Sequence, residues 1–97
     1  MSHFPYLQFA AMEKFASSPD GMIARDLTYL FPGSATEHGR CSRAAELVHA
    51  LRCKGYLRES GRRTPEGGRY PVRLWAATAA GLAWLESERA EMAGASR

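Results

Sequence analysis

Hydrophobic residues near the start of the chain recur at the spacing of one helix face. They are Phe4, Leu7, Ala11, Met12 and Phe15. Their spacing predicts a helix over residues 4–16. Pro5 fits the first turn, where its missing N–H costs nothing. The turn-forming residues 17–21, SSPDG, end the helix.

A shorter helix is predicted over residues 22–31. Its apolar side consists of Ile23, Leu27, Leu30 and Phe31. Met22 and Ile23 begin the segment and are expected to be extended rather than helical. Residues 32–34, PGS, end it because proline and glycine interrupt a helix.

The third helix has the clearest apolar side, which is formed by Ala44, Leu47, Val48 and Leu51. The pattern is clean from Arg40 onward. The start lies between Thr36 and Arg40, with either Thr36 or Ser34 as the cap, because Gly39 weakens the first turn. Lys54 and Gly55 end the helix, since a cation and a glycine both favour a helix C-terminus.

After Gly55 the spacing of apolar residues changes from helical to extended. This pattern predicts a first strand over residues 56–59 and a second strand over residues 69–76. Between them, residues 60–68 (SGRRTPEGG) are predicted to form a flexible basic loop. One face of the second strand carries Tyr70, Val72 and Leu74. The other face carries Arg69, Arg73 and Trp75. Pro71 suits the edge of a sheet. Two strands around one loop predict a β-hairpin.

A last helix is predicted from Thr78, a favourable N-cap, to about Met92. One side of it carries Ala79, Leu82 and Leu85, with Trp84 beside them. Residues 93–97 are small and polar and are expected to form a flexible tail. The pattern therefore predicts a single α+β, mainly α domain over residues 1–92, followed by this tail.

The composition fits a single globular domain, with 97 residues of which 45% are hydrophobic. No apolar run approaches the roughly 20 residues that span a bilayer, and the first residues lack the regions of a signal peptide. We therefore expect a cytoplasmic protein without membrane contact. Cys41 and Cys53, about 18 Å apart along one helix, are too distant for a disulfide. Buried or partly buried free thiols are expected.

The net charge is +3, and the positive charge is concentrated in the middle of the chain. Residues 36–73 contain nine basic and four acidic side chains, whereas each flanking segment has one more acidic than basic residue. A basic segment between two slightly acidic ones is typical of a surface that binds a polyanion.

Two segments resemble the winged helix-turn-helix, the DNA-binding module of many small bacterial regulators. Residues 42–57, SRAAELVHALRCKGYL, are similar to its recognition helix running into the first strand of its wing. Residues 74–85, LWAATAAGLAWL, are similar to the strand and following helix of MarR- and PadR-type regulators. The resemblance spans about residues 22–85. The connection at residues 32–39 is longer than a tight helix-turn-helix turn.

The resemblance implies a winged-helix fold, with three helices, a two-stranded β-hairpin wing and a C-terminal helix. It also implies that the third helix enters the major groove of double-stranded DNA while the wing contacts the minor groove or the phosphates. The candidate DNA-binding residues of the helix, expected on or near one face, are Arg40, Ser42, Arg43, Glu46 and His49. Those of the hairpin are Arg58, Arg62, Arg63, Arg69 and Arg73. The alternative for both sets is an ordinary solvated surface.

The last helix is the candidate surface for a homodimer. Leu82, Trp84 and Leu85 are more apolar than a lone terminal helix needs. They favour either a seam between two copies or packing against the first helix.

The sequence contains no pattern that predicts catalysis. We find no glycine-rich phosphate loop and no nucleophile with a base at helical spacing. His3, His38 and His49 do not share a metal-ligand spacing, so no metal and no cofactor are expected. A redox role of the Cys41 thiol, near basic residues at the start of a helix, stays open.

The leading hypothesis is a DNA-binding regulator of transcription. The second is a protein-interaction module, such as a phage-encoded accessory or inhibitor protein, because a fold does not fix a function. The third is a replication or recombination accessory that binds DNA without sequence preference. The operator, any effector ligand and the oligomeric state stay open.

Overall fold

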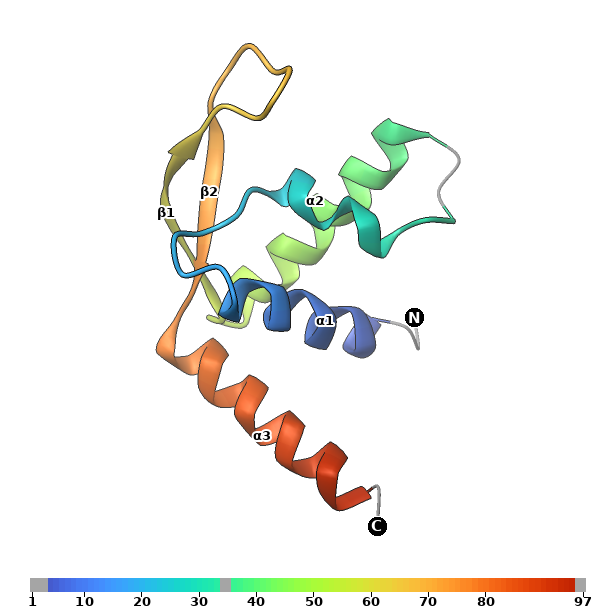
Figure 1. Cartoon of the computed structure of the whole chain (residues 1–97), viewed down its shortest axis with the longest axis vertical. Helices are drawn as coiled ribbons and strands as arrows, with labels where there is room; N and C mark the ends of the chain where they lie inside the picture. The colour runs from blue at the N-terminus through green and yellow to red at the C-terminus, as the bar shows by residue number, and fades with distance from the viewer. Residues whose placement is uncertain (1–3, 34–35, 96–97) are drawn as a thin grey trace.

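The computed structural model describes residues 4–33 and 36–95. Along the chain it contains α1 (Phe4–Ala16), the 3-10 helix η1 (Ala24–Leu30), α2 (Glu37–Cys53), β1 (Leu57–Arg63), β2 (Val72–Ala77) and α3 (Ala79–Ala95). Within these residues the fold is α+β and mainly helical, with four helices and one two-stranded antiparallel sheet. Figure 1 shows the β1–β2 hairpin at one end of the longest axis and the end of α3 at the other.

The uncertain start of α2 is resolved by its cap. The helix begins at Glu37, and the hydroxyl of Thr36 accepts a hydrogen bond from the Gly39 amide at 3.0 Å. The earlier of the two expected starts is therefore confirmed, because this bond satisfies an amide that has no partner inside the helix. The helix ends at Cys53, shortly before Gly55, as the sequence predicts.

The second helix is shorter and tighter than the prediction over residues 22–31, because η1 is a 3-10 helix that spans Ala24–Leu30. Its extended start is confirmed. Met22 and Trp75 exchange two backbone hydrogen bonds, at 2.9 and 2.8 Å. β2 therefore has the Met22 segment on one side and β1 on the other.

The hairpin differs from the prediction at both strands. β1 continues to Arg63, so residues 60–63, assigned to the loop by their turn-forming composition, belong to the strand, and residues 61–63 pair with β2. β2 begins at Val72, three residues later than expected, because Pro71 has no N–H to donate to the ladder. The predicted alternation does not appear in the burial of β2, because the successive residues Trp75 and Ala76 are both buried. Trp75 is the β2 side chain that belongs to the core cluster.

The predicted cap of the last helix is confirmed at Thr78. Its hydroxyl caps the first turn of α3 and donates a hydrogen bond to the Gly55 carbonyl at 2.6 Å, which ties α3 to the end of α2. The helix continues to Ala95 rather than ending near Met92. Residues 93–95, assigned to a tail, are therefore helical, in keeping with the high helix propensity of alanine. The last two residues lie outside the described range.

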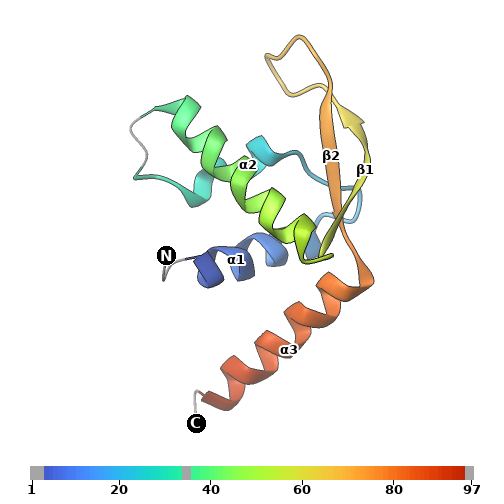
Figure 2. The ribbon, with the colours of Figure 1, turned by 180° about the vertical axis from the view of Figure 1, so that it is seen from behind.

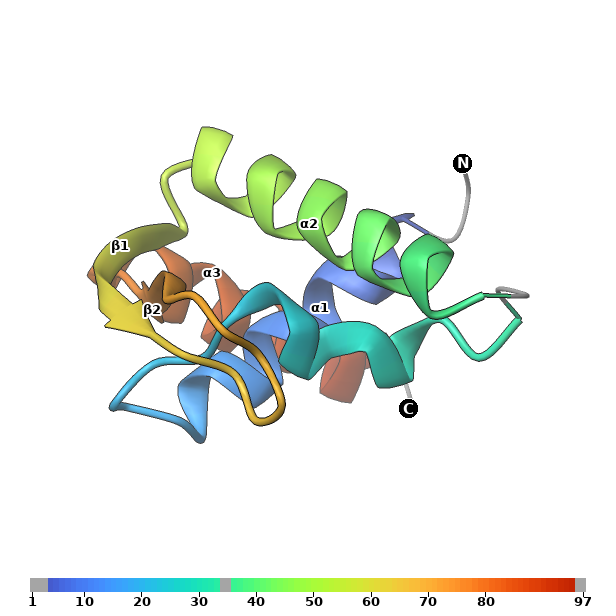
Figure 3. The same ribbon diagram turned by 90° about the horizontal axis from the view of Figure 1, so that it is seen from above.

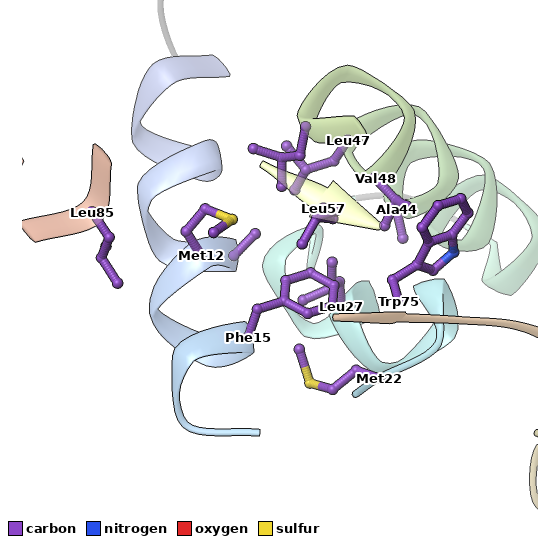
Figure 4. Packing of buried hydrophobic residues seen from close by; sticks show 12 residues of the cluster. Met12, Phe15, Met22, Leu27, Ala44, Leu47, Val48, Leu57, Trp75 and Leu85 are labelled. Carbon is purple, nitrogen blue, oxygen red and sulfur yellow. The ribbon is translucent and has the colours of Figure 1, made fainter. Parts of the chain in front are cut away.

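The core forms where α1, η1, α2 and the sheet meet (Figure 4). α1 lies between α3 on one side and α2 with the sheet on the other. Gln8 is the polar side chain buried among the described residues, and it accepts a hydrogen bond from Lys54 at 2.9 Å. The largest fully buried side chains are Met12, Phe15, Ile23, Leu27, Leu47, Leu51 and Leu85. The apolar sides predicted for η1 and α2, and that of α1 from Leu7 onward, are therefore confirmed. The Phe4 side chain lies outside the described part of the structure.

The substitution Gly81→Ala should destabilise the protein, because α3 packs closely on the segment after α2. A Cβ at Gly81 would overlap the Tyr56 carbonyl oxygen and lie 2.7 Å from the terminal methyl carbon of Met12. We expect a decrease of about 1–3 kcal/mol in the free energy of unfolding, measured by chemical denaturation. Gly94→Ala is the matched control, since nothing lies within 4 Å of its Cβ. Equal effects of the two substitutions would contradict this packing.

Candidate nucleic-acid interface

The exposed side of α2 lies opposite its buried side. Figure 2 shows α2 lying across η1 and running toward the base of the hairpin. The exposed residues opposite the core are spaced four, three and four positions apart, as one helix side requires. They are Ser42, Glu46, His49 and Cys53, and we call them the α2 crest.

Arg40 and Arg43 do not lie on this crest. Arg43 is on the flank of α2 nearest η1 and makes no hydrogen bond or ion pair within the described residues. It borders a shallow groove with Leu30, Phe31, Pro32 and Gly33. Arg40 is partly buried. The expectation of one shared face is therefore wrong for these two arginines, since successive helix residues point about 100° apart.

The other flank of α2 faces the hairpin across a groove, which we call the hairpin groove. It is lined by Ala24, Ala45, Val48, His49, Arg52, Arg73 and Trp75. The guanidinium of Arg52 lies 5.9 Å from the centroid of the Trp75 ring, which is 7% exposed. Sequence reasoning missed Arg52, although its spacing of three residues from His49 places both on one side of α2.

The hairpin adds two arginines beside this groove. Arg62 lies directly opposite Arg73 in the β1–β2 register, and opposed residues of an antiparallel pair share a face. Both therefore lie on the face of Trp75. Arg73 Nε is 3.7 Å from Glu59 Oε1, whereas Arg62 makes no ion pair in the described part of the chain. Like charges opposite each other destabilise a sheet, so an anion bound here would relieve their repulsion.

A β-bulge places Arg62 on the same face of the hairpin as Arg73. The register shifts between Glu59 and Gly61, which leaves Ser60 as the extra residue of β1. Without this extra residue, Arg62 would point to the opposite face from Glu59, because side chains alternate along a strand. Gly61 has a φ of 153°, which glycine adopts readily. The bulge therefore decides the direction of a charged side chain.

The other candidate arginines of the hairpin are directed elsewhere. Arg58 and Arg63 lie on the opposite face of the strands, and Arg69 lies in the loop between them. Arg63 forms an ion pair with Asp26 of η1 at 2.6 Å. Arg58 and Arg69 are exposed and form no ion pair among the described residues. The structure thus brings together only part of the predicted set. These residues are Ser42, Glu46 and His49 on the crest, Arg43 on one flank of α2, and Arg62 and Arg73 on the hairpin face beside the groove.

Arg25 connects the hairpin loop with the start of α2. One guanidinium nitrogen donates a hydrogen bond to the Glu66 carbonyl at 3.2 Å, and another lies 3.3 Å from the Glu37 carboxylate. Figure 3 shows the hairpin loop passing beside the start of η1, where Arg25 lies near the beginning of the element. The hairpin is therefore held in a defined position relative to α2.

The three candidate dimer residues do not form one exposed surface. Leu85 is 2% exposed and belongs to the core, on the α1 side of α3. Trp84 stacks on Tyr56, with ring centroids 5.1 Å apart. Leu82 is 44% exposed. The alternative interpretation, packing against the first helix, therefore holds for Leu85.

Both cysteines carry free thiols, and Cys53 is exposed rather than buried. Its Sγ lies 3.5 Å from His49 Nε2, a thiol–imidazole pair at helical spacing that sequence reasoning overlooked. The described residues contain no group of three or more His, Cys, Asp or Glu side chains that could hold a metal ion; His3 lies outside them. None of the described helices is long and apolar enough to cross a membrane.

Comparisons with protein-family models, with curated proteins and with solved structures gave no match to this chain. The case for a function therefore rests on the surface itself. That surface consists of the α2 crest between two basic flanks, with Arg43 on one flank and Arg52, Arg62 and Arg73 on the other.

The substitution Arg25→Ala should loosen the hairpin loop. It removes the interactions with Glu66 and Glu37, so amide hydrogen exchange at residues 63–70 should become faster. The free energy of unfolding should change by less than about 1 kcal/mol, because these interactions are exposed. Arg69→Ala is the control, since Arg69 has no partner among the described residues. Unchanged exchange in Arg25→Ala would show that the loop is held by other interactions.

Proposed function

We propose that this chain is a winged-helix domain that binds double-stranded DNA and regulates transcription. In this proposal the α2 crest enters the major groove and the β1–β2 hairpin is the wing. The order of elements supports it, as do the Met22–Trp75 bridge beside the hairpin and the packing of α2 against η1. The DNA-binding role rests on charge and geometry.

The observation that carries the proposal is a cluster of three arginines, of which Arg52 and Arg73 line the hairpin groove and Arg62 lies next to Arg73. Arg62 and Arg73 face each other across the two strands, and Arg52 lies on the helix across the groove. Only Glu59 among the described residues forms an ion pair with any of them. Guanidinium groups bind phosphate oxygens through paired hydrogen bonds. A phosphate of the DNA backbone is therefore the ligand that this cluster fits best.

The two flanks of α2 suit the two strands of a duplex. A major groove of about 12 Å admits one helix and places a phosphate backbone on each side of it. Arg43 lies on one flank of the crest, and the hairpin groove lies on the other. The crest between them carries Ser42, Glu46 and His49, which are side chains that can hydrogen bond to base edges. Groups that read bases favour a sequence-specific regulator over an accessory protein without sequence preference.

A protein partner is the second candidate, and exposed apolar residues of the hairpin favour it. Tyr70 is 75% exposed and Val72 is 41% exposed. Such residues contribute to protein interfaces, although a wing that enters the minor groove also uses apolar contacts. A stoichiometric protein complex that forms without DNA affinity would support this candidate over the first.

The double substitution Arg62→Ala/Arg73→Ala should weaken DNA binding in a salt-dependent manner. Fluorescence anisotropy with a labelled duplex at several salt concentrations gives the slope of log affinity against log salt. Each arginine–phosphate interaction that is lost should reduce the magnitude of this slope by about 0.9, so the double variant should lose up to about 1.8. The free energy of unfolding should stay equal or rise slightly, because the substitution removes two opposed like charges.

Arg89→Ala is the control for the loss of a positive charge elsewhere on the protein. Arg89 lies on α3, where it pairs with Glu13 at 3.5 Å, far from the hairpin along the longest axis. Its substitution removes a single positive charge and should leave most of the salt slope intact. Failure of the unmodified protein to bind any duplex at low salt, or an equal decrease in affinity per charge in both variants, would refute the proposal.

A further inference from the structure

The carboxylate of Glu46 occupies the outermost line of α2 and is left without a partner. Glu46 is exposed, and it makes no hydrogen bond or ion pair among the described residues. Arg43 is three positions earlier, a spacing at which a helix can form an ion pair, yet the two side chains do not pair. A negative charge thus stands between two basic flanks.

The neighbours of Glu46 allow this carboxylate to project. Ser42 and Ala50 lie one turn before and after it, and both side chains are short. Glu46 therefore extends further from the helix axis than these two neighbours, and His49 is the other long side chain beside it on the crest. A surface that approaches DNA with the α2 crest foremost brings this carboxylate to the base edges, with His49 beside it.

A carboxylate in this position has a narrow choice of favourable partners on DNA. Phosphates repel it, and so do the carbonyl and ring nitrogen acceptors of guanine. The exposed hydrogen-bond donors of the major groove are the amino groups of cytosine and adenine. Adenine presents its amino group beside an acceptor, which suits an amide side chain, whereas cytosine presents only the donor. Cytosine is therefore the base that Glu46 fits best.

We infer that Glu46 selects a cytosine in the major groove and is a specificity-determining residue of the DNA surface. This inference rests on the proposed function and adds the chemical identity of one recognised base. The arginines on the two flanks supply affinity for any duplex. Glu46 lowers that general affinity by repulsion and restores it only where a cytosine amino group faces the carboxylate.

The test is selection of bound duplexes from a randomised pool with the unmodified protein and with Glu46→Gln. The unmodified protein should yield a consensus with one C·G position that the variant no longer prefers. In anisotropy titrations, replacing that pair should weaken binding of the unmodified protein by about 5- to 100-fold. The variant should bind both duplexes within a few-fold of each other and should bind random DNA more tightly than the unmodified protein does.

Glu86→Gln, on the exposed side of α3, is the matched control and should leave the consensus unchanged. The inference is overturned if Glu46→Gln tightens binding to all duplexes equally while the C·G preference stays. It is also overturned if the unmodified protein binds duplexes without any consensus, although DNA binding itself then stands. Absence of binding to the whole pool overturns the proposed function as well.

Discussion

The position of Trp75 is the constraint on which the rest of this surface depends. Its backbone exchanges two hydrogen bonds with Met22, which ties β2 to the segment before η1. Its nearly buried ring packs against α2 beneath Arg52. One residue thus joins the hairpin, the second helix and α2. Because these three parts are fixed to the same side chain, the arginines of the hairpin and of α2 keep a constant separation across the groove.

Charge placement on this scaffold follows from a small number of backbone features. The bulge at Ser60 reverses the direction of the side chains that follow it in β1, which puts Arg62 on the same face as Arg73. The interactions of Arg25 hold the loop beyond the strands beside the start of α2. The net charge of the middle segment is therefore less informative than the directions in which its individual arginines point. Some of its arginines face the groove, and Arg63 is neutralised by Asp26.

Features with a local cause could be predicted from the sequence, and features that depend on pairing between distant segments could not. The caps at Thr36 and Thr78 could be predicted because each threonine hydroxyl accepts a hydrogen bond from an amide only three residues later. The place of Arg62 depends on a register slip that turn-forming composition conceals, so the composition predicts a loop where the chain forms a strand. Arg52 was missed because its role appears only when β2 lies beside α2. The burial of Leu85 could not be predicted, because it depends on a contact between α3 and α1, which lie at opposite ends of the chain. The sequence therefore left Leu85 as a candidate for a dimer interface.

The most direct measurement of the central claim is an NMR titration of the isotopically labelled protein with a short duplex. We expect chemical-shift changes on the α2 crest, on the Arg52, Arg62 and Arg73 side chains, and on the indole N–H of Trp75. Signals of α3 beyond Leu85 should remain unchanged. Shift changes confined to α1 and α3, or no changes at low salt, would contradict the claim that α2 and the hairpin form one DNA-binding surface.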